Sequence, residues 1–325
     1  MMVLALACAC SSSRSDDDAP LFGAGASAPA PAGGDSAPPD PSAEGESGAG
    51  AGEPGGGEAS GAGLAGAPLD GANSAEAPPS EAGQDATSAE APLAPAAGAS
   101  PFPSGVTRPR ILIVGDSISA GPGCYKKYLL SNLTQNGYSS FEFVGQYPDD
   151  CGGGVMHGAV SCSTAEQYTL PMFTMPNCAQ GMSFPGMSTL VSTHQPDLVM
   201  MQLGVNDVWN NRPIDAILAN YTTLVEQARA QNPNVVVVAA QIAQMNPNRT
   251  EGDAIFQHAA ALVAAVPAWA QSVALPESPV FVADLWTNSG WADADTTDGV
   301  HPTEAGAERM GLNWFNALKG VLPPG

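Results

Sequence analysis

Ser117, the serine of a Gly-Asp-Ser tripeptide, is the first of three polar positions from which hydrolytic chemistry could be assembled. A serine hydroxyl becomes a useful nucleophile when a neighbouring base takes its proton. A tight turn between a strand and a helix exposes such a serine and directs backbone N–H groups towards an oxyanion. The tripeptide alone is a weak signal, because Gly34-Asp35-Ser36 repeats it in a segment without an apolar run before it.

Two further clusters supply the groups that a serine nucleophile needs. Asn206, in the run Gly204-Val205-Asn206-Asp207, carries an amide that could donate to a developing oxyanion. Asp298 and His301 are three residues apart, so the histidine could take the serine proton while the carboxylate holds its tautomer. Each pattern alone also fits an ordinary turn or helix cap. Their joint presence, each expected to follow a strand, predicts a hydrolase with Ser117, His301 and Asp298 as catalytic residues.

Alternating strands and helices would have to position these residues. Short apolar runs predict five strands, at residues 110–114, 141–144, 198–203, 235–239 and 280–283. Helical spacing predicts helices at residues 124–136, 164–168, 214–231, 253–266 and 304–318, with residues 268–275 extending the fourth after a break at Pro267. Continuous apolar strands are typical of a parallel sheet that is buried on both faces. We therefore expect a three-layer α/β/α sandwich with a five-stranded parallel sheet and a site beyond the carboxyl ends of its strands.

In this order of motifs, Gly-Asp-Ser, Gly-x-Asn-Asp and Asp-x-x-His-Pro, the chain resembles the GDSL/SGNH hydrolase family over nearly all of residues 110–319. The runs 123–126, 196–199 and 298–302, with Gly306 after them, resemble its carbohydrate esterase branch, which includes acetylxylan esterases. The resemblance implies that Ser117 is the nucleophile, His301 the base and Asp298 its partner. It also implies an oxyanion hole formed by the Ser117 backbone N–H and Asn206.

The sequence differs from the family pattern at one position of the second conserved block. An ungapped match of the second block, residues 157–167, places Cys162 where the family has a glycine whose N–H completes the oxyanion hole. A cysteine keeps that N–H, but a positive φ would carry a steric cost. Gapped matches would assign the third donor to Gly158 or Gly186 instead.

The composition divides the chain into three parts. Residues 1–10 end an apolar segment that resembles a lipoprotein-type leader, with Cys8 or Cys10 as the lipidated position. Residues 11–106 are rich in Ala, Gly, Pro and Ser, and we expect a disordered acidic linker. Residues 107–325 form the expected hydrolase domain, with 18 acidic and nine basic residues, a net charge of about −9. This negative charge argues against nucleic acid as a partner. We expect an exported protein, extracellular or anchored to a bacterial envelope.

Four cysteines lie in the domain, Cys124, Cys151, Cys162 and Cys178. They form no Cys-x-x-Cys pair, which argues against zinc. In an exported protein an even number of cysteines favours two disulfides, whose pairing the sequence leaves open.

Other polar and aromatic residues are expected to be structural. His157, His194 and His258 have no partners at a catalytic or metal-ligating spacing. Asp293 and Asp295 could suggest calcium, but a solvated loop explains them, and we expect neither a metal nor a cofactor. Trp209, Trp286 and Trp291 flank the expected site loops and could form a sugar platform, although packing explains each of them.

These features predict a secreted serine esterase that acts through an acyl-serine intermediate. The family resemblance implies that it removes short acyl groups, such as acetyl groups of a polysaccharide. Two alternatives stay open. A lysophospholipase or thioesterase-like lipid esterase would use the same residues. A catalytically inactive surface-binding module with the same fold would explain the departure at Cys162.

Overall fold

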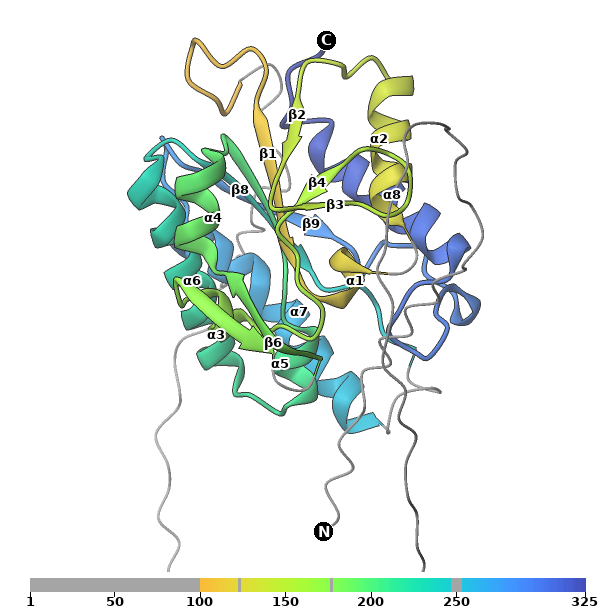
Figure 1. The fold of residues 1–325 in the computed structure, drawn as a ribbon. Helices are drawn as coiled ribbons and strands as arrows, with labels where there is room; N and C mark the ends of the chain where they lie inside the picture. The colour runs from red at the N-terminus through yellow and green to blue at the C-terminus, as the bar shows by residue number, and fades with distance from the viewer. Residues whose placement is uncertain (1–99, 122–123, 176–177, 247–252) are drawn as a thin grey trace, which may run out of the picture. The chain divides into compact units, whose positions relative to one another are not determined.

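Five parallel strands form one sheet in the order β2-β1-β7-β8-β9 (Figure 1). The computed structural model describes residues 100–325 except 122–123, 176–177 and 247–252. The strands of the sheet are β1 (Arg110–Gly115), β2 (Glu142–Val144), β7 (Leu198–Gln202), β8 (Val236–Gln241) and β9 (Val280–Asp284). Every residue of β7 and β8 is buried, as expected for strands that are covered on both faces. The five predicted strands are thus present, with ends shifted by one or two residues.

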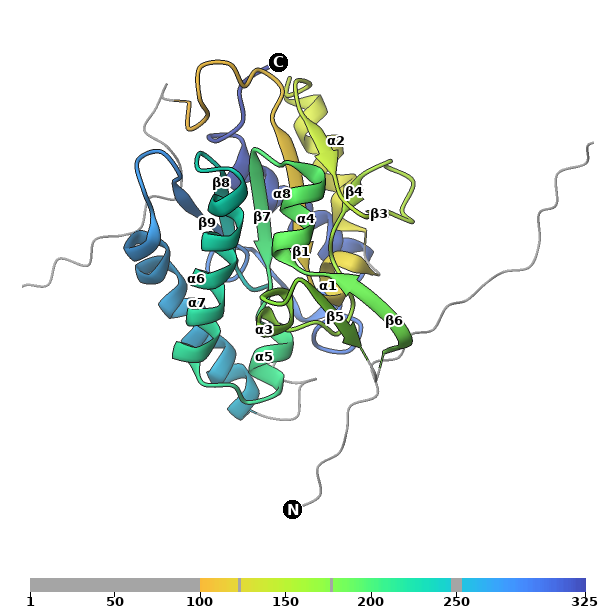
Figure 2. The same ribbon diagram turned by 60° about the vertical axis from the view of Figure 1, so that its left-hand side comes forward.

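Helices cover both faces of this sheet (Figures 1 and 2). One face carries α4 (Met187–His194), α6 (Ile214–Gln231) and α7 (Asp253–Val273), and the other carries α2 (Tyr125–Gln135) and α8 (Glu304–Leu318). Apolar residues at helical spacing along α6, among them Ile217, Tyr221 and Leu224, form a buried stripe. The expected three-layer α/β/α architecture is confirmed.

The segment between β2 and β7 contains more regular structure than the sequence predicted. In this segment the sequence predicted a single short helix, at residues 164–168. That helix is present as α3 (Ala165–Tyr168), but the segment also forms two antiparallel hairpins. They consist of β3 (Tyr147–Pro148) with β4 (Met156–His157), and of β5 (Met172–Met175) with β6 (Ala179–Pro185). The second hairpin is anchored because Phe173, Met175 and Phe184 are buried in the core. Helix α4 and the short helix α5 (Val205–Trp209) were not predicted either.

Pro267 does not interrupt the helix in which it lies, and the predicted break there is wrong. Helix α7 continues from Asp253 to Val273 with Pro267 inside it. A proline in a helix leaves the carbonyl four residues earlier without its usual N–H partner. That carbonyl belongs to Val263, and it accepts a hydrogen bond from the Gln241 side chain at 3.1 Å. A side chain from β8 therefore replaces the missing helical bond.

The packed body begins before the boundary expected at Thr107. Phe102 is buried in the hydrophobic core, and Val106 packs against it. A single large aromatic side chain can bury enough apolar surface to order a short segment beside a core. The predicted leader and most of the predicted linker, residues 1–99, lie outside the described residues. Among the described residues, no helix is long and apolar enough to cross a membrane.

The four cysteines of the domain form two disulfides. Cys124 is paired with Cys151, and Cys162 with Cys178, with Cα–Cα distances of 5.5 and 6.5 Å. This is one of the three pairings that the sequence left open. The first disulfide joins the start of α2 to the β3–β4 hairpin, and the second joins the loop before α3 to the β5–β6 hairpin.

Candidate active site

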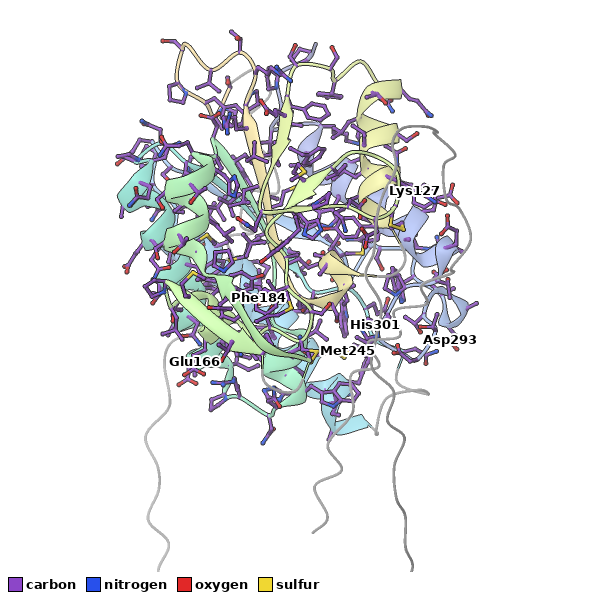
Figure 3. The ribbon with its side chains drawn as sticks, viewed as in Figure 1. Lys127, Glu166, Phe184, Met245, Asp293 and His301 are labelled. Carbon is purple, nitrogen blue, oxygen red and sulfur yellow. A yellow bond between two sulfur atoms is a disulfide. The ribbon has the colours of Figure 1, made fainter. Side chains whose placement is uncertain are left out.

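The polar residues singled out in the sequence lie beyond the carboxyl ends of the strands. Ser117 is the first residue of α1 (Ser117–Ala120), which follows β1. Asn206 lies in α5, directly after the neighbouring strand β7. Asp298 and His301 lie on the loop that precedes α8, and His301 is at the end of the sheet where α1 follows β1 (Figures 1 and 3). The fold thus gathers residues from three distant segments of the chain.

A hydrogen-bonded chain links three of these side chains. His301 Nε2 lies 2.9 Å from Ser117 Oγ, and His301 Nδ1 lies 2.7 Å from Asp298 Oδ2. The second oxygen of Asp298 accepts hydrogen bonds from the backbone N–H groups of Val300 and His301. Partial burial acts to raise the pKa of the Asp298 carboxyl, but these hydrogen bonds outweigh it and leave that pKa below its usual value. Asp298 is therefore a carboxylate that fixes the imidazole ring, with Nε2 directed at the serine.

The turn that carries Ser117 is built by its neighbours. Asp116 caps α1, because its Oδ1 accepts a hydrogen bond from the Ile118 N–H at 3.0 Å. Gly115 has no room for a side chain, since an added Cβ would lie 2.5 Å from Ser119 Oγ and 2.8 Å from the Gln202 carbonyl oxygen. These constraints place the Ser117 hydroxyl at the amino end of α1, where backbone N–H groups have no partner within the helix.

Asp116 is itself buried beside the site. Its second oxygen, Oδ2, has no hydrogen-bond partner among the described residues. Burial raises the pKa of the Asp116 carboxyl to about 7, although the hydrogen bond from Ile118 and the charge of His301 act to lower it. This buried, partly satisfied acid was not expected from the local sequence, because its burial depends on the packing of α1 against the sheet.

The loop that contains Cys162 runs beside the end of β1. The N–H of Val160 donates to the Gly115 carbonyl at 2.9 Å, and Ser163 Oγ donates to the same carbonyl at 3.3 Å. Cys162 lies between these two anchors with a φ of 65°. The positive φ considered from the sequence is therefore present, and the bonds of Val160 and Ser163 hold the loop against Gly115, two residues before Ser117. Gly158 packs under Leu190, and Gly186 precedes α4.

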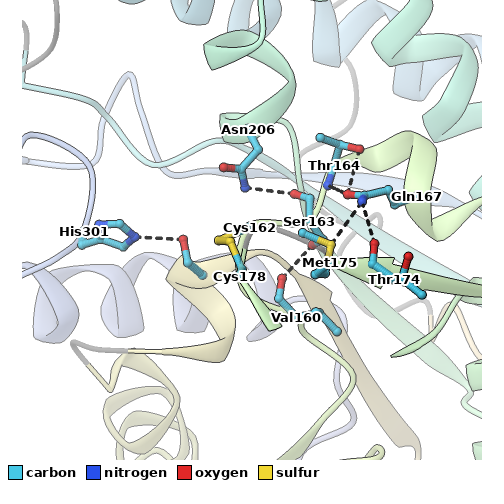
Figure 4. The surroundings of a disulfide bond; sticks show 11 residues. Val160, Cys162, Ser163, Thr164, Gln167, Thr174, Met175, Cys178, Asn206 and His301 are labelled. Carbon is cyan, nitrogen blue, oxygen red and sulfur yellow. Dashed lines mark hydrogen bonds between the residues drawn. A yellow bond between two sulfur atoms is a disulfide. The ribbon is translucent and has the colours of Figure 1, made fainter. Parts of the chain in front are cut away.

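Asn206 and Asp207 both hold this loop. Asn206 Nδ2 donates to the Ser163 carbonyl at 2.9 Å (Figure 4). Asp207 Oδ2 accepts a hydrogen bond from the Ala165 N–H at 2.9 Å. The amide of Asn206 has a second hydrogen that the bond to Ser163 does not use. Asp207, which the sequence reading left without a role, is thus a buried anchor for the start of α3.

Three of the residues expected to be structural, His157, Asp295 and Trp286, have packing or hydrogen-bond partners. His157 is buried and accepts a hydrogen bond from Ala159 N–H, and burial lowers its pKa to about 4. Asp295 is paired with Arg309 at 2.8 Å. Trp286 packs against the ring of Phe256. Within the described residues, no group of three or more histidine, cysteine, aspartate or glutamate side chains could hold a metal ion.

The chain is similar to several known proteins that are named as esterases. A multidomain esterase of Ruminococcus flavefaciens is 27% identical over 228 residues, which are 66% of this chain and 29% of that protein. The chain thus spans less than a third of the length of that relative. A family 3 carbohydrate esterase from Talaromyces cellulolyticus has 27% identity and a TM-score of 0.54, covering 65% of this chain and 96% of its own. A family 3 carbohydrate esterase from Clostridium thermocellum has 25% identity and a TM-score of 0.52, and the match covers 66% of this chain and 97% of that chain.

A third solved structure, an acetyl esterase mutant with an acetate ion, has 27% identity and a TM-score of 0.54, covering 65% of this chain and 96% of that chain. The model of the GDSL-like lipase/acylhydrolase family matches residues 113–309, a span that begins within β1 and includes Ser117, Asn206, Asp298 and His301. The resemblance read from the sequence is confirmed, and the chain belongs to the GDSL-like lipase/acylhydrolase family.

Proposed function

We propose that this protein is a serine ester hydrolase in which Ser117 is the nucleophile, His301 the general base and Asp298 the residue that orients the base. The observation that carries the proposal is the pair of distances at His301, 2.9 Å from Nε2 to Ser117 Oγ and 2.7 Å from Nδ1 to Asp298 Oδ2. A base within hydrogen-bond reach of the nucleophile, and itself held by a third group, is the arrangement that activates a serine.

The reaction would proceed in two acyl transfers. Ser117 Oγ attacks the ester carbonyl while His301 Nε2 takes its proton. The tetrahedral intermediate collapses as His301 returns that proton to the departing alcohol, which leaves an acyl-serine. Water then attacks the acyl group with His301 again as base, and the acid and free Ser117 are released. Asp298 stabilises the imidazolium at both stages through its bond to Nδ1.

The oxyanion hole would be formed by the backbone N–H groups of Ser117 and Cys162 and by the side-chain amide of Asn206. Support comes from the position of the Cys162 loop, whose flanking residues Val160 and Ser163 both bond to the Gly115 carbonyl. The Asn206 amide bonds to the same loop. Donors fixed before the reaction stabilise the developing charge without reorganisation.

The proposed substrate is an acetyl ester of a polysaccharide. It is supported by the solved relatives, which are named an acetyl esterase and family 3 carbohydrate esterases. The proposed location is outside the cell, since two disulfides are typical of oxidising compartments. The proposed anchor is a lipid on Cys8 or Cys10. A lipid esterase is the second candidate, favoured by the exposed apolar side chains of Leu170, Met172 and Met182 in and beside the β5–β6 hairpin.

Hydrolysis of 4-nitrophenyl esters of increasing chain length tests the proposal. We expect the full chain to cleave the acetate ester fastest, and to cleave the other esters more slowly as their acyl chains lengthen. Ser117→Ala should remove the activity. Ser36→Ala, in the second Gly-Asp-Ser tripeptide, is the matched control and should leave it intact.

The substrate class is tested by comparing acetate release from acetylated xylan with cleavage of a lysophospholipid. Preference for the lysophospholipid would replace the polysaccharide with the lipid candidate. No hydrolysis of any ester, together with no labelling of Ser117 by a fluorophosphonate, would favour the inactive binding module instead.

A further inference from the structure

The turn that presents Cys162 has a backbone shape that favours glycine. The N–H of Ser163 donates to the Val160 carbonyl at 3.3 Å, so residues 160–163 form a turn with Ser161 and Cys162 at its centre. Of the two central residues only Cys162 has a positive φ, 65°. A positive φ at the third position of a turn is the pattern of type II, in which glycine is preferred because a side chain is strained there. Something must therefore keep Cys162 in this conformation.

Hydrogen bonds hold both ends of the turn. Val160 and Ser163 bond to the Gly115 carbonyl, and the Ser163 carbonyl accepts from Asn206 Nδ2. No corresponding backbone bond fixes the peptide between Ser161 and Cys162 among the described residues. Since this peptide contains the Cys162 N–H, its orientation depends on the φ of Cys162 and the ψ of the residue before it.

The side chain of Cys162 is tied to a well-packed element. Its disulfide partner, Cys178, directly precedes β6, and the N–H of Cys178 donates to the Met175 carbonyl at 3.2 Å. The β5–β6 hairpin is held in the core by Phe173 and Phe184. In Figure 4 the disulfide lies between His301 and the bond of Asn206 to Ser163. The disulfide therefore connects a strained turn at the site to a fixed hairpin.

We propose that the Cys162–Cys178 disulfide is a positioning device that holds Cys162 in the left-handed conformation and thereby directs its backbone N–H into the oxyanion hole. Cys178 is then a positioning residue for turnover. A glycine would adopt the positive φ at position 162 without strain, whereas a cysteine is held in that conformation by the disulfide. The inference rests on the proposed esterase function. It also explains how the chain can carry Cys162 where a donor glycine was expected.

The test compares glycine and alanine at position 162 in a chain without the disulfide. Removing the bond with Cys178→Ser should lower kcat for 4-nitrophenyl acetate at least tenfold and change KM little, because a donor used mainly in the transition state is misplaced. The double variant Cys162→Gly/Cys178→Ser should recover most of kcat, since glycine adopts a positive φ without strain. The double variant Cys162→Ala/Cys178→Ser should stay as slow as Cys178→Ser.

Thermal unfolding of the two double variants shows which of them is more stable, and comparing this with their activities separates a positioning role of the disulfide from general stabilisation. Both double variants lack the disulfide, and glycine adds freedom to the unfolded chain, so a purely structural role predicts no better activity for the glycine variant than for the alanine variant. Equal kcat in the two double variants, or kcat of Cys178→Ser within twofold of the wild type, would overturn the inference. Wild-type hydrolysis that does not depend on Ser117 would instead overturn the proposed function.

Discussion

The side-chain amide of Gln241 donates a hydrogen bond to the backbone carbonyl of Val263, with 3.1 Å between Nε2 and the oxygen. This carbonyl would otherwise bond to residue 267, where proline has no N–H. A strand and a helix are thus joined at a point inside the helix where proline leaves a backbone carbonyl without its helical partner.

We expect Gln241→Leu to lower the free energy of unfolding by about 1–3 kcal/mol, because a buried carbonyl is left without a partner. In a Pro267→Ala background the alanine N–H can restore the helical bond, so Gln241→Leu should cost about 1 kcal/mol less there. Urea unfolding of the four proteins measures this coupling. An equal cost of Gln241→Leu in both backgrounds would show that the bond does not compensate for the proline.

The continuous helix through Pro267 could not be predicted from the local sequence. A proline is a local signal for a break, and the residue that removes the break, Gln241, lies in a different element. The five strands were predictable because each is a continuous apolar run, and a sheet covered on both faces requires such runs. Strand β5 also carried a readable signal, since Met172 and Thr174 are exposed while Phe173 and Met175 are buried. The surrounding glycines and cysteines concealed that alternation.

The site was only partly predictable for a related reason. Ser117, Asp298 and His301 could be proposed because each residue type has a chemical role and each follows an expected strand. The partner of Cys162 could not, because the choice of Cys178 depends on how a hairpin folds back on the loop. The anchoring bond of Asp207 to Ala165 likewise joins segments whose contact no local pattern specifies.

Lys126 and Asp149 form a buried ion pair, with 3.2 Å between Nζ and Oδ1. Burial lowers the pKa of Lys126, and the charge of Asp149 opposes that shift. We expect Lys126→Met alone to lower the free energy of unfolding by about 3–5 kcal/mol, because Asp149 is left as an unpaired buried charge. The double variant Lys126→Met/Asp149→Leu should recover part of this loss. Chemical unfolding measures both, and a double variant that is less stable than Lys126→Met would contradict the expectation.

The contribution of His157 to stability should decrease in mild acid. Burial, followed by the charge of Lys126, lowers the pKa of His157 from 6.5 to about 4. Between these two pH values the unfolded chain binds a proton that the folded chain does not. The contribution of His157 to the free energy of unfolding is therefore fully present above about pH 6.5 and falls as the pH drops towards 4. The slope from this group approaches about 1.4 kcal/mol per pH unit. The free energy of unfolding of His157→Asn, relative to the wild type, should therefore increase as the pH falls from 6.5 to 4.5, and a difference that stays constant with pH would assign the wild-type dependence to other groups.

Asp116 should act in the opposite direction. Burial raises the pKa of its carboxyl to about 7, so between about pH 4 and 7 the folded chain binds a proton that the unfolded chain has released. The contribution of Asp116 to stability is therefore greatest in acid and is lost as the pH rises to about 7. Asp116→Asn keeps an oxygen that can accept from Ile118 N–H and cannot ionise. The free energy of unfolding of this variant, relative to the wild type, should increase from pH 5 to pH 8. A constant difference over that range would show that burial does not raise the pKa of Asp116 in the folded state.

Asn206 has two possible contributions to turnover, and two variants separate them. Its amide holds the Cys162 loop through the Ser163 carbonyl, and its second hydrogen is the proposed oxyanion donor. Asn206→Ala should lower kcat by about 10²–10³ through loss of that donor. Asn206→Asp has nearly the same shape but places a negative charge beside the developing oxyanion, so above pH 7 it should be slower than Asn206→Ala. If Asn206 only held the loop, both variants would lose the bond to Ser163 and be similarly slow. Hydrolysis of 4-nitrophenyl acetate at pH 8 by the two variants therefore distinguishes a donor to the reaction from a support for the loop.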